Sequence, residues 1–139
     1  MTLEDQIYDF VYAYDAAFER AAQSVGLSGP QACLLVQLAR GSRTMGELAV
    51  ELVCDASNVS QMVGRLEAQG LVARQPDPDD RRTRQVSITE SGIEATRDVD
   101  SRFSLPSEGV ARLSGDEREH LSRLLTKAFG QSHIDAEPG

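Results

Sequence analysis

Apolar residues recur at steps of three and four positions along the start of the chain, the spacing of one face of a helix. The pattern predicts a first helix that ends near Gly26, where a glycine suits a helix terminus. The stripe consists of Leu3, Ile7, Phe10, Val11, Tyr14, Ala17, Phe18 and Ala21. A stripe of this length needs a partner surface to cover it.

Two further helices are indicated by capping signals. Ser28 followed by Gln31 has capping-box spacing and predicts a second, largely apolar helix up to Gly41. Thr44 with Glu47 repeats the spacing and opens a short third helix.

The next segment predicts a fourth helix with two unlike faces. A turn is expected at residues 53–56, and the helix is expected to run from Ser57 to Gln69 and to stop at Gly70. The residues expected to be buried are Val59, Met62, Val63 and Leu66. The residues expected to face solvent are Asn58, Ser60, Gln61, Gly64 and Arg65.

A β-hairpin with a long tip is expected after this helix. Leu71, Val72 and Arg74 begin a strand, residues 76–83 form a turn-rich charged loop, and apolar and polar residues alternate again over 85–88.

The C-terminal third predicts two helices. Thr89 caps a helix that loses its pattern near Ser104, and Pro106 makes an uninterrupted helix there unfavourable. Ser114 with Glu117 is another capping box, followed by a last amphipathic helix with Leu121, Leu124, Leu125, Ala128 and Phe129.

This order of elements predicts a mainly α fold with a small β-hairpin wing (α+β), a winged helix-turn-helix with N- and C-terminal dimerisation helices. We expect one domain over residues 1–139, with the DNA-binding part at about 28–92. Residues 1–26 and 93–130 are the expected dimerisation helices, and 131–139 a polar tail. The apolar stripes of the terminal helices exceed what a monomer usually exposes, which favours a homodimer.

The fourth helix has the residues that a DNA groove requires. The major groove of B-DNA admits a helix whose outer face is polar and unbulky, so that amides and hydroxyls reach base edges. Ser57, Asn58, Ser60 and Gln61 meet that requirement near the helix N-terminus.

The hairpin tip adds cations beside that helix. Arg81, Arg82 and Arg84 are candidates to contact DNA, one of them in the electronegative minor groove. Asp80 repels phosphate, so we expect it to hold an arginine in position.

The charge distribution allows this interpretation although the formal net charge is −8. Residues 1–30 and 89–139 each carry −4, whereas 58–88 carry +1 and hold five arginines. A local basic surface can therefore face DNA while the acidic parts point away.

Composition narrows the class further. No apolar run approaches the roughly 20 residues that span a bilayer, so we expect a soluble, cytoplasmic protein. Two cysteines without His or Cys neighbours at ligand spacing suggest no disulfide framework, no metal site and no cofactor. No catalytic constellation or phosphate loop is present, so we expect no enzyme.

The stretch from Asn58 to Gly92 resembles the signature of the MarR family of transcriptional regulators. The matching features are Leu66-Glu67, Gly70-Leu71-Val72, Asp80-Arg81-Arg82, Thr89 and Gly92, at agreeing spacings. The resemblance implies that Arg82 enters the minor groove, Arg65 contacts phosphate, and Asn58, Ser60 and Gln61 read bases. It also implies a homodimeric repressor of a pseudo-palindromic operator that responds to a small-molecule effector of unknown identity.

Alternatives stay open for function and for single residues. A winged helix that binds protein and not DNA, or a cysteine-based redox regulator with Cys54 as sensor, fits the same order of elements. Tyr8, Tyr12 and Tyr14 are ligand-cleft candidates, with core packing the safer interpretation for Tyr14. Cys33, among leucines, is expected to be a small buried hydrophobe.

Overall fold

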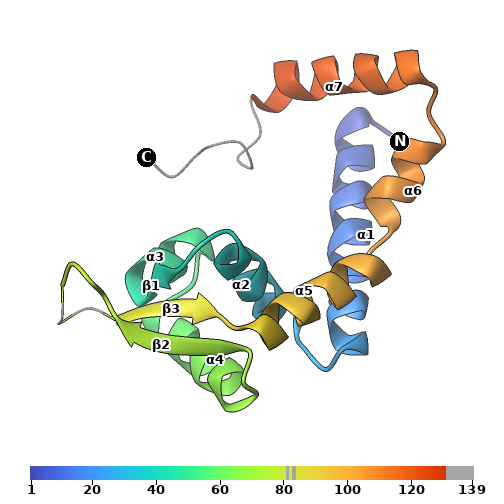
Figure 1. The fold of residues 1–139 in the computed structure, drawn as a ribbon. Coiled ribbons are helices and arrows are strands. Elements are labelled where there is room, and N and C mark those ends of the chain that lie inside the picture. The colour runs from blue at the N-terminus through green and yellow to red at the C-terminus, as the bar shows by residue number, and fades with distance from the viewer. Residues whose placement is uncertain (81, 83, 131–139) are drawn as a thin grey trace. The chain divides into compact units, whose positions relative to one another are not determined.

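The computed structural model describes residues 1–80, 82 and 84–130 and divides into two compact units. The first unit comprises Met1–Phe103 and the second Ser104–Gly139. Figure 1 shows the order of helices and strands along the chain.

The first two helices begin at the capping signals of the sequence. Helix α1 spans Leu3–Ser24, and Thr2 caps it reciprocally with Asp5. Helix α2 spans Gly29–Ala39, where the Ser28 hydroxyl accepts from the Gln31 N–H at 3.2 Å and the Gln31 side chain accepts from the Ser28 N–H at 3.0 Å. Both predicted helices are confirmed because local hydrogen bonds satisfy the first N–H groups.

A tight helix-turn-helix follows. Helix α3 spans Met45–Glu51 with Thr44 as its cap, and α4 spans Ala56–Ala68. Helix α4 begins one residue before the predicted start, and the Asp55 side chain caps it by accepting from the Asn58 N–H at 2.8 Å. Val53 in the turn has a φ of 50°, a left-handed conformation that is strained for a β-branched residue.

Three strands form an antiparallel sheet in the order β1-β3-β2. The predicted hairpin is confirmed as β2, Val72–Pro76, and β3, Arg84–Ile88, with Arg74 opposite Val86 in the centre. Strand β1, Arg43–Thr44, adds a third strand that the sequence pattern did not reveal. Two residues are too few to show alternation.

The core of the first unit joins its helices to the sheet. Its fully buried large side chains are Leu34, Leu35, Leu38, Leu48, Val59, Val63, Leu66 and Val86. They come from α2, α3, α4 and β3, so burial of apolar area fixes the helix-turn-helix against the sheet.

Helix α5, Glu90–Arg102, is joined to the end of α4 by a compact junction. Gly70, at φ +74°, ends α4 in a conformation that glycine adopts without strain. The Thr89 hydroxyl donates to the Gly70 carbonyl at 2.6 Å and accepts from the Gly92 N–H at 3.1 Å. Any Cβ at Gly92 would collide with the Leu71 carbonyl oxygen, so only glycine fits there.

The second unit contains two helices. Helix α6 spans Leu105–Ala111 and α7 spans Gly115–Phe129, the latter with the predicted capping box at Ser114. The sequence pattern predicts only a break at Pro106, whereas this residue lies in the first turn of α6. Proline fits there because an N–H in the first turn has no intrahelical acceptor.

The predicted fold class is confirmed: the described chain is mainly helical with a small antiparallel sheet. Among the described helices, none combines the length and the apolarity needed to cross a membrane.

Candidate nucleic-acid interface

The N-terminal part of α4 presents a polar face to solvent. Ser57, Asn58, Ser60 and Gln61 are all exposed, while the opposite face is buried. The Asp55 carboxylate accepts from the Ser57 hydroxyl at 2.9 Å and from the Asn58 side-chain amide at 3.2 Å. Hydrogen bonding to the α4 backbone, chiefly from the Asn58 N–H, lowers the pKa of Asp55, so its charge stays beside these side chains. The cap therefore orients two of the four predicted readers.

Arg65 lies in the last turn of α4 and is exposed. Its neighbour Leu66 is fully buried. Because consecutive helix residues point in different directions, Arg65 faces solvent while Leu66 packs into the core.

The β2–β3 hairpin carries the predicted wing residues. Arg82 and Arg84 are exposed, whereas Arg81 lies outside the described residues. The Asp80 carboxylate accepts from the backbone N–H of Arg82 at 3.0 Å. Asp80 thereby fixes the backbone that presents Arg82.

Arg74 links the hairpin to α4, a role that sequence reasoning missed. Its Nε lies 3.6 Å from the Glu67 carboxylate and is buried without a hydrogen bond. The strand places it inward, because alternate residues of β2 point toward α4. Arg74 therefore contributes to the position of the wing, although by sequence it belongs to the basic segment.

A second ion pair supports the sheet edge. Arg43 Nε lies 2.9 Å from Glu51 Oε1, and Arg43 Nη1 also donates to the carbonyls of Gly41 and Ser42. These bonds hold β1 against the end of α3. No sequence motif marked this pair.

The three tyrosines lie in different surroundings on α1. Tyr8 and Tyr12 are 66% and 74% exposed. Tyr14 packs edge-on against Phe103, with ring centroids 4.8 Å apart, and Phe103 also contacts Phe18. The structure thus gives Tyr14 an aromatic packing role, and a ligand role for these tyrosines stays a prediction.

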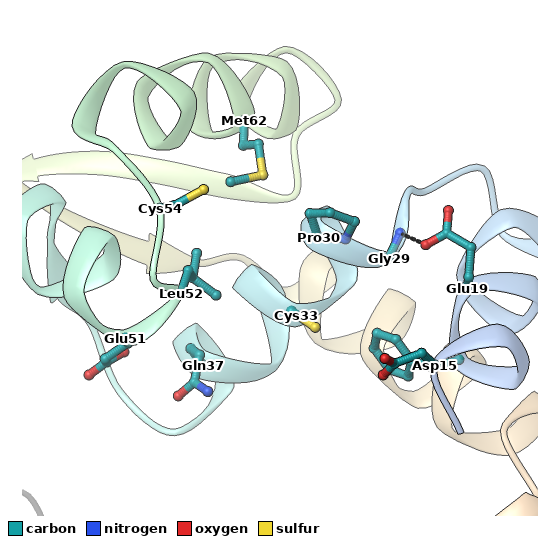
Figure 2. A pocket seen from close by; sticks show the side chains of 11 residues that line it. Asp15, Glu19, Gly29, Pro30, Cys33, Gln37, Glu51, Leu52, Cys54 and Met62 are labelled. Atoms are coloured by element: carbon teal, nitrogen blue, oxygen red, sulfur yellow. Dashed lines mark hydrogen bonds between the residues drawn. The ribbon is translucent and has the colours of Figure 1, made fainter. Parts of the chain in front are cut away.

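A cavity of about 480 Å³ opens within the first unit. Its walls come from α1, α2, the end of α3 and α4, and Figure 2 shows Asp15 and Glu19 on one side, with Cys54 and Met62 across from them. Neither Tyr8, Tyr12 nor Tyr14 lines it.

Both cysteines lie on this cavity. The prediction of a buried Cys33 is wrong: the residue is exposed, because it lies on the face of α2 that points away from the leucine core. Partial desolvation and then the charges of Asp15 and Glu19 raise the pKa of the Cys33 thiol. Cys54 is half-buried and packs against the core.

Each unit also exposes an apolar helix face. On α1, Leu3, Ile7, Phe10 and Val11 are 37–68% exposed. On α7, the exposed apolar residues are Leu121, Leu124, Leu125 and Phe129. Both faces match the stripes that the sequence assigned to dimerisation.

A helix-turn-helix with an adjoining β-hairpin defines the class of winged-helix proteins. Solved structures of that class share this fold. MarR of Escherichia coli in its apo form superposes with a TM-score of 0.78 at 24% identity, over 93% of this chain and 97% of that chain. A mutant of the same protein in complex with operator DNA gives 0.70 at 25% identity, over 91% and 93%.

Sequence comparison shows which family the winged-helix part is similar to. Residues 25–83 match the model of the MarR family. The transcriptional activatory protein BadR of Rhodopseudomonas palustris is 38% identical over 77 residues, 52% of this chain and 44% of BadR. The transcriptional repressor IacR of Pseudomonas putida is 29% identical over 124 residues, 84% of this chain and 71% of IacR. The chain spans about half the length of the first curated relatives that it matches. Over its winged-helix part the chain is thus similar to the regulators of the MarR family.

Proposed function

We propose that the chain is a sequence-specific DNA-binding transcriptional regulator that binds a pseudo-palindromic operator as a homodimer in the cytoplasm. The observation that carries the proposal is the polar, exposed N-terminal face of α4 beside a hairpin whose exposed residues include Arg82 and Arg84. A helix of this kind fits the major groove, and an arginine of the wing fits the adjacent minor groove.

The proposed roles follow from position. Ser57, Asn58, Ser60 and Gln61 face the bases, and Arg65 faces a phosphate. Arg82 inserts into the minor groove and Arg84 contacts the backbone, with Arg81 assigned to the wing on sequence alone. Repression follows where the operator overlaps a promoter, because bound protein blocks access to it.

The homodimer rests on the exposed apolar faces of α1 and α7. Scattered apolar residues on a surface are ordinary, but two helices that each expose four or more in a stripe favour a partner. A second copy supplies it with two-fold symmetry, and the half-sites then lie about one helical turn apart, roughly 34–36 Å.

Arg82→Ala tests the wing directly. Selected operator DNA is titrated with wild type and variant at several salt concentrations. We expect weaker binding and a salt slope shallower by about 1 for each half-site that loses the Arg82 charge. Arg97→Ala, on α5 and outside α4 and the hairpin, removes the same charge and serves as control.

An unchanged affinity and slope in Arg82→Ala would remove the wing from the proposal. A chain that binds no duplex with sequence preference even at low salt would overturn the proposed function. Sedimentation of wild type against Leu124→Glu tests the dimer, for which we expect loss of the wild-type dimer in the variant.

A further inference from the structure

The turn between α3 and α4 carries an apolar side chain that packs against nothing in the fold. Val53 is 92% exposed, the highest fraction among the large apolar side chains that the structure describes. Val50, one helical turn earlier, is 79% exposed. Neither residue belongs to the core or to the partly buried side chains packed against it. Burial on folding therefore does not account for an apolar residue at position 53.

Val53 also has an unusual backbone conformation. Its φ is 50°, and among the described residues it is the only one other than glycine with a positive φ. The Val53 N–H donates to the Val50 carbonyl at 3.2 Å, and the Cys54 N–H donates to the Ala49 carbonyl at 3.0 Å. This pair of hydrogen bonds is that of a Schellman helix end, in which glycine usually takes the left-handed position.

Two other helices of the chain show what this helix end ordinarily contains. Helices α1 and α4 end with the same pair of hydrogen bonds, and Gly26 and Gly70 take the left-handed position, with φ of 81° and 74°. A β-branched side chain is strained in that conformation, whereas glycine is not. Val53 thus introduces strain and gains no packing in return. Residues held in such conformations cluster at functional sites.

The position of Val53 connects it with the proposed nucleic-acid interface. It lies two residues before Asp55, the cap of α4, and the exposed polar residues of α4 follow directly. The charged residues over positions 44–64 are Glu47, Glu51 and Asp55, with no Lys, Arg or His. A phosphate contact needs a cation or another donor, so Val53 and its surroundings are unsuited to the DNA backbone. Contact with the bases is what this surface can offer.

Only one group on the base edges of the major groove matches an apolar side chain. The edges present hydrogen-bond donors and acceptors, and the C5-methyl group of thymine is the exception. Amides and hydroxyls such as those of α4 pair with the polar edges, whereas a valine removes the methyl group from water.

We propose that Val53 is a specificity-determining residue that contacts a thymine methyl group of the operator, beside the bases that α4 reads. Val50 extends the same apolar surface by one helical turn. The inference rests on the proposed function, because it presupposes that α4 enters the major groove of an operator.

Val53→Gly first tests whether the side chain serves the fold. Urea unfolding of wild type and variant is followed by circular dichroism at one chain concentration. We expect an equal or higher urea midpoint in the variant, because glycine adopts the left-handed conformation without strain. A lower midpoint would show that Val53 supports the fold and would overturn the proposal.

Deoxyuridine tests the contact itself, because it differs from thymidine only by the missing C5-methyl group. Operator DNA is selected with wild type, and each thymine position is replaced by deoxyuridine in both half-sites. For wild type we expect one position at which affinity falls about fourfold for each methyl group, about fifteenfold for the two half-sites. For Val53→Gly we expect no loss at that position, so the two changes are coupled.

Val53→Ala and Val36→Ala form a matched pair, because each removes the same two methyl groups. Val36 is 41% exposed on α2, outside α3, α4 and the hairpin. We expect Val36→Ala to keep the wild-type dependence on thymine methyl groups and Val53→Ala to reduce it at the one position. Weaker operator binding by Val53→Gly with every deoxyuridine effect retained would overturn the proposal.

The same titrations distinguish this proposal from the proposed function. Operator binding by wild type and the Val53 variants with one common deoxyuridine profile would refute the thymine contact alone and would point to a protein partner for this surface. Failure of wild type to bind any duplex with sequence preference would refute the proposed function and the thymine contact together.

Discussion

Arg65 and Leu66 are consecutive residues of α4 with opposite environments, so alanine at each should give opposite results. Leu66 is 0% exposed, whereas Arg65 is exposed. Leu66→Ala removes three carbons from a closed core, at about 0.8 kcal/mol each, and leaves a cavity. We expect a loss of roughly 2.5–5 kcal/mol in the free energy of unfolding. This is a large part of the roughly 5–15 kcal/mol of a typical domain.

Arg65→Ala should leave stability within about 0.5 kcal/mol of wild type, because the side chain is exposed and its removal opens no cavity in the core. It should reduce operator affinity and flatten the salt slope by about 1.8, one phosphate at each of two half-sites. Urea unfolding followed by circular dichroism at one fixed chain concentration measures the first effect, and operator titration measures the second.

Two outcomes would refute the reasoning. Equal losses of stability in both variants would show that α4 does not bury one face and expose the other. An unchanged salt slope in Arg65→Ala would remove this residue from the phosphate-binding set. Leu66→Ala must be titrated under conditions where it is folded, so that weaker binding is not mistaken for unfolding.

Three further predictions concern the junction, the thiol and the cap. Gly92→Ala should lower stability by about 1–3 kcal/mol, because the new methyl meets the backbone carbonyl of Leu71 and no rotamer change relieves it; wild-type stability in urea would contradict this. Cys33 should react with iodoacetamide at mildly alkaline pH more slowly than in the unfolded chain, and Asp15→Asn should accelerate it, because burial and then nearby carboxylates raise the pKa of the thiol. Mass spectrometry of the Cys33 peptide would show equal rates if this is mistaken. Asp55 has a lowered pKa, so its cap stabilises the fold above the ordinary carboxyl pKa and this contribution disappears as the pH falls through the lowered value. Asp55→Asn should therefore flatten the acid limb of stability against pH, and an identical limb would argue against the cap.

Most helices could be predicted because their signals are local. The capping boxes at Ser28 and Ser114 each lie within four residues of sequence, and the structure forms both. The fold class was confirmed for the same reason: residues at fixed spacings, such as Thr89 and Gly92, act through short-range hydrogen bonds.

The missed features depend on contacts between distant residues. Strand β1 exists through its pairing with β3, and nothing in residues 43–44 alone indicates it. Cys33 follows the apolar spacing of its helix, but which face of α2 meets the core depends on α1, α5 and β3, which pack against it. Arg74 looks like a DNA-facing cation by sequence and turns toward Glu67 because of strand alternation.

The candidate site could be predicted as a set of residues but not as a geometry. The sequence predicts helix α4 and the wing. It does not predict the cavity with its acidic lining, because α1, α2 and α4, which form its walls, are far apart in the sequence. Tyr8, Tyr12 and Tyr14 do not line this cavity, and a ligand role for them stays a prediction.

The hydrogen bonds that Thr89 makes to Gly70 and Gly92 close the hairpin at its base, far from the tip. Because these bonds hold the base of the hairpin, the sequence of its tip can change without moving the two strands. A loop of another length or charge can therefore replace the one between β2 and β3 while α4 keeps its position. Exchange of the hairpin tip alone would then change which operator sequence the protein prefers.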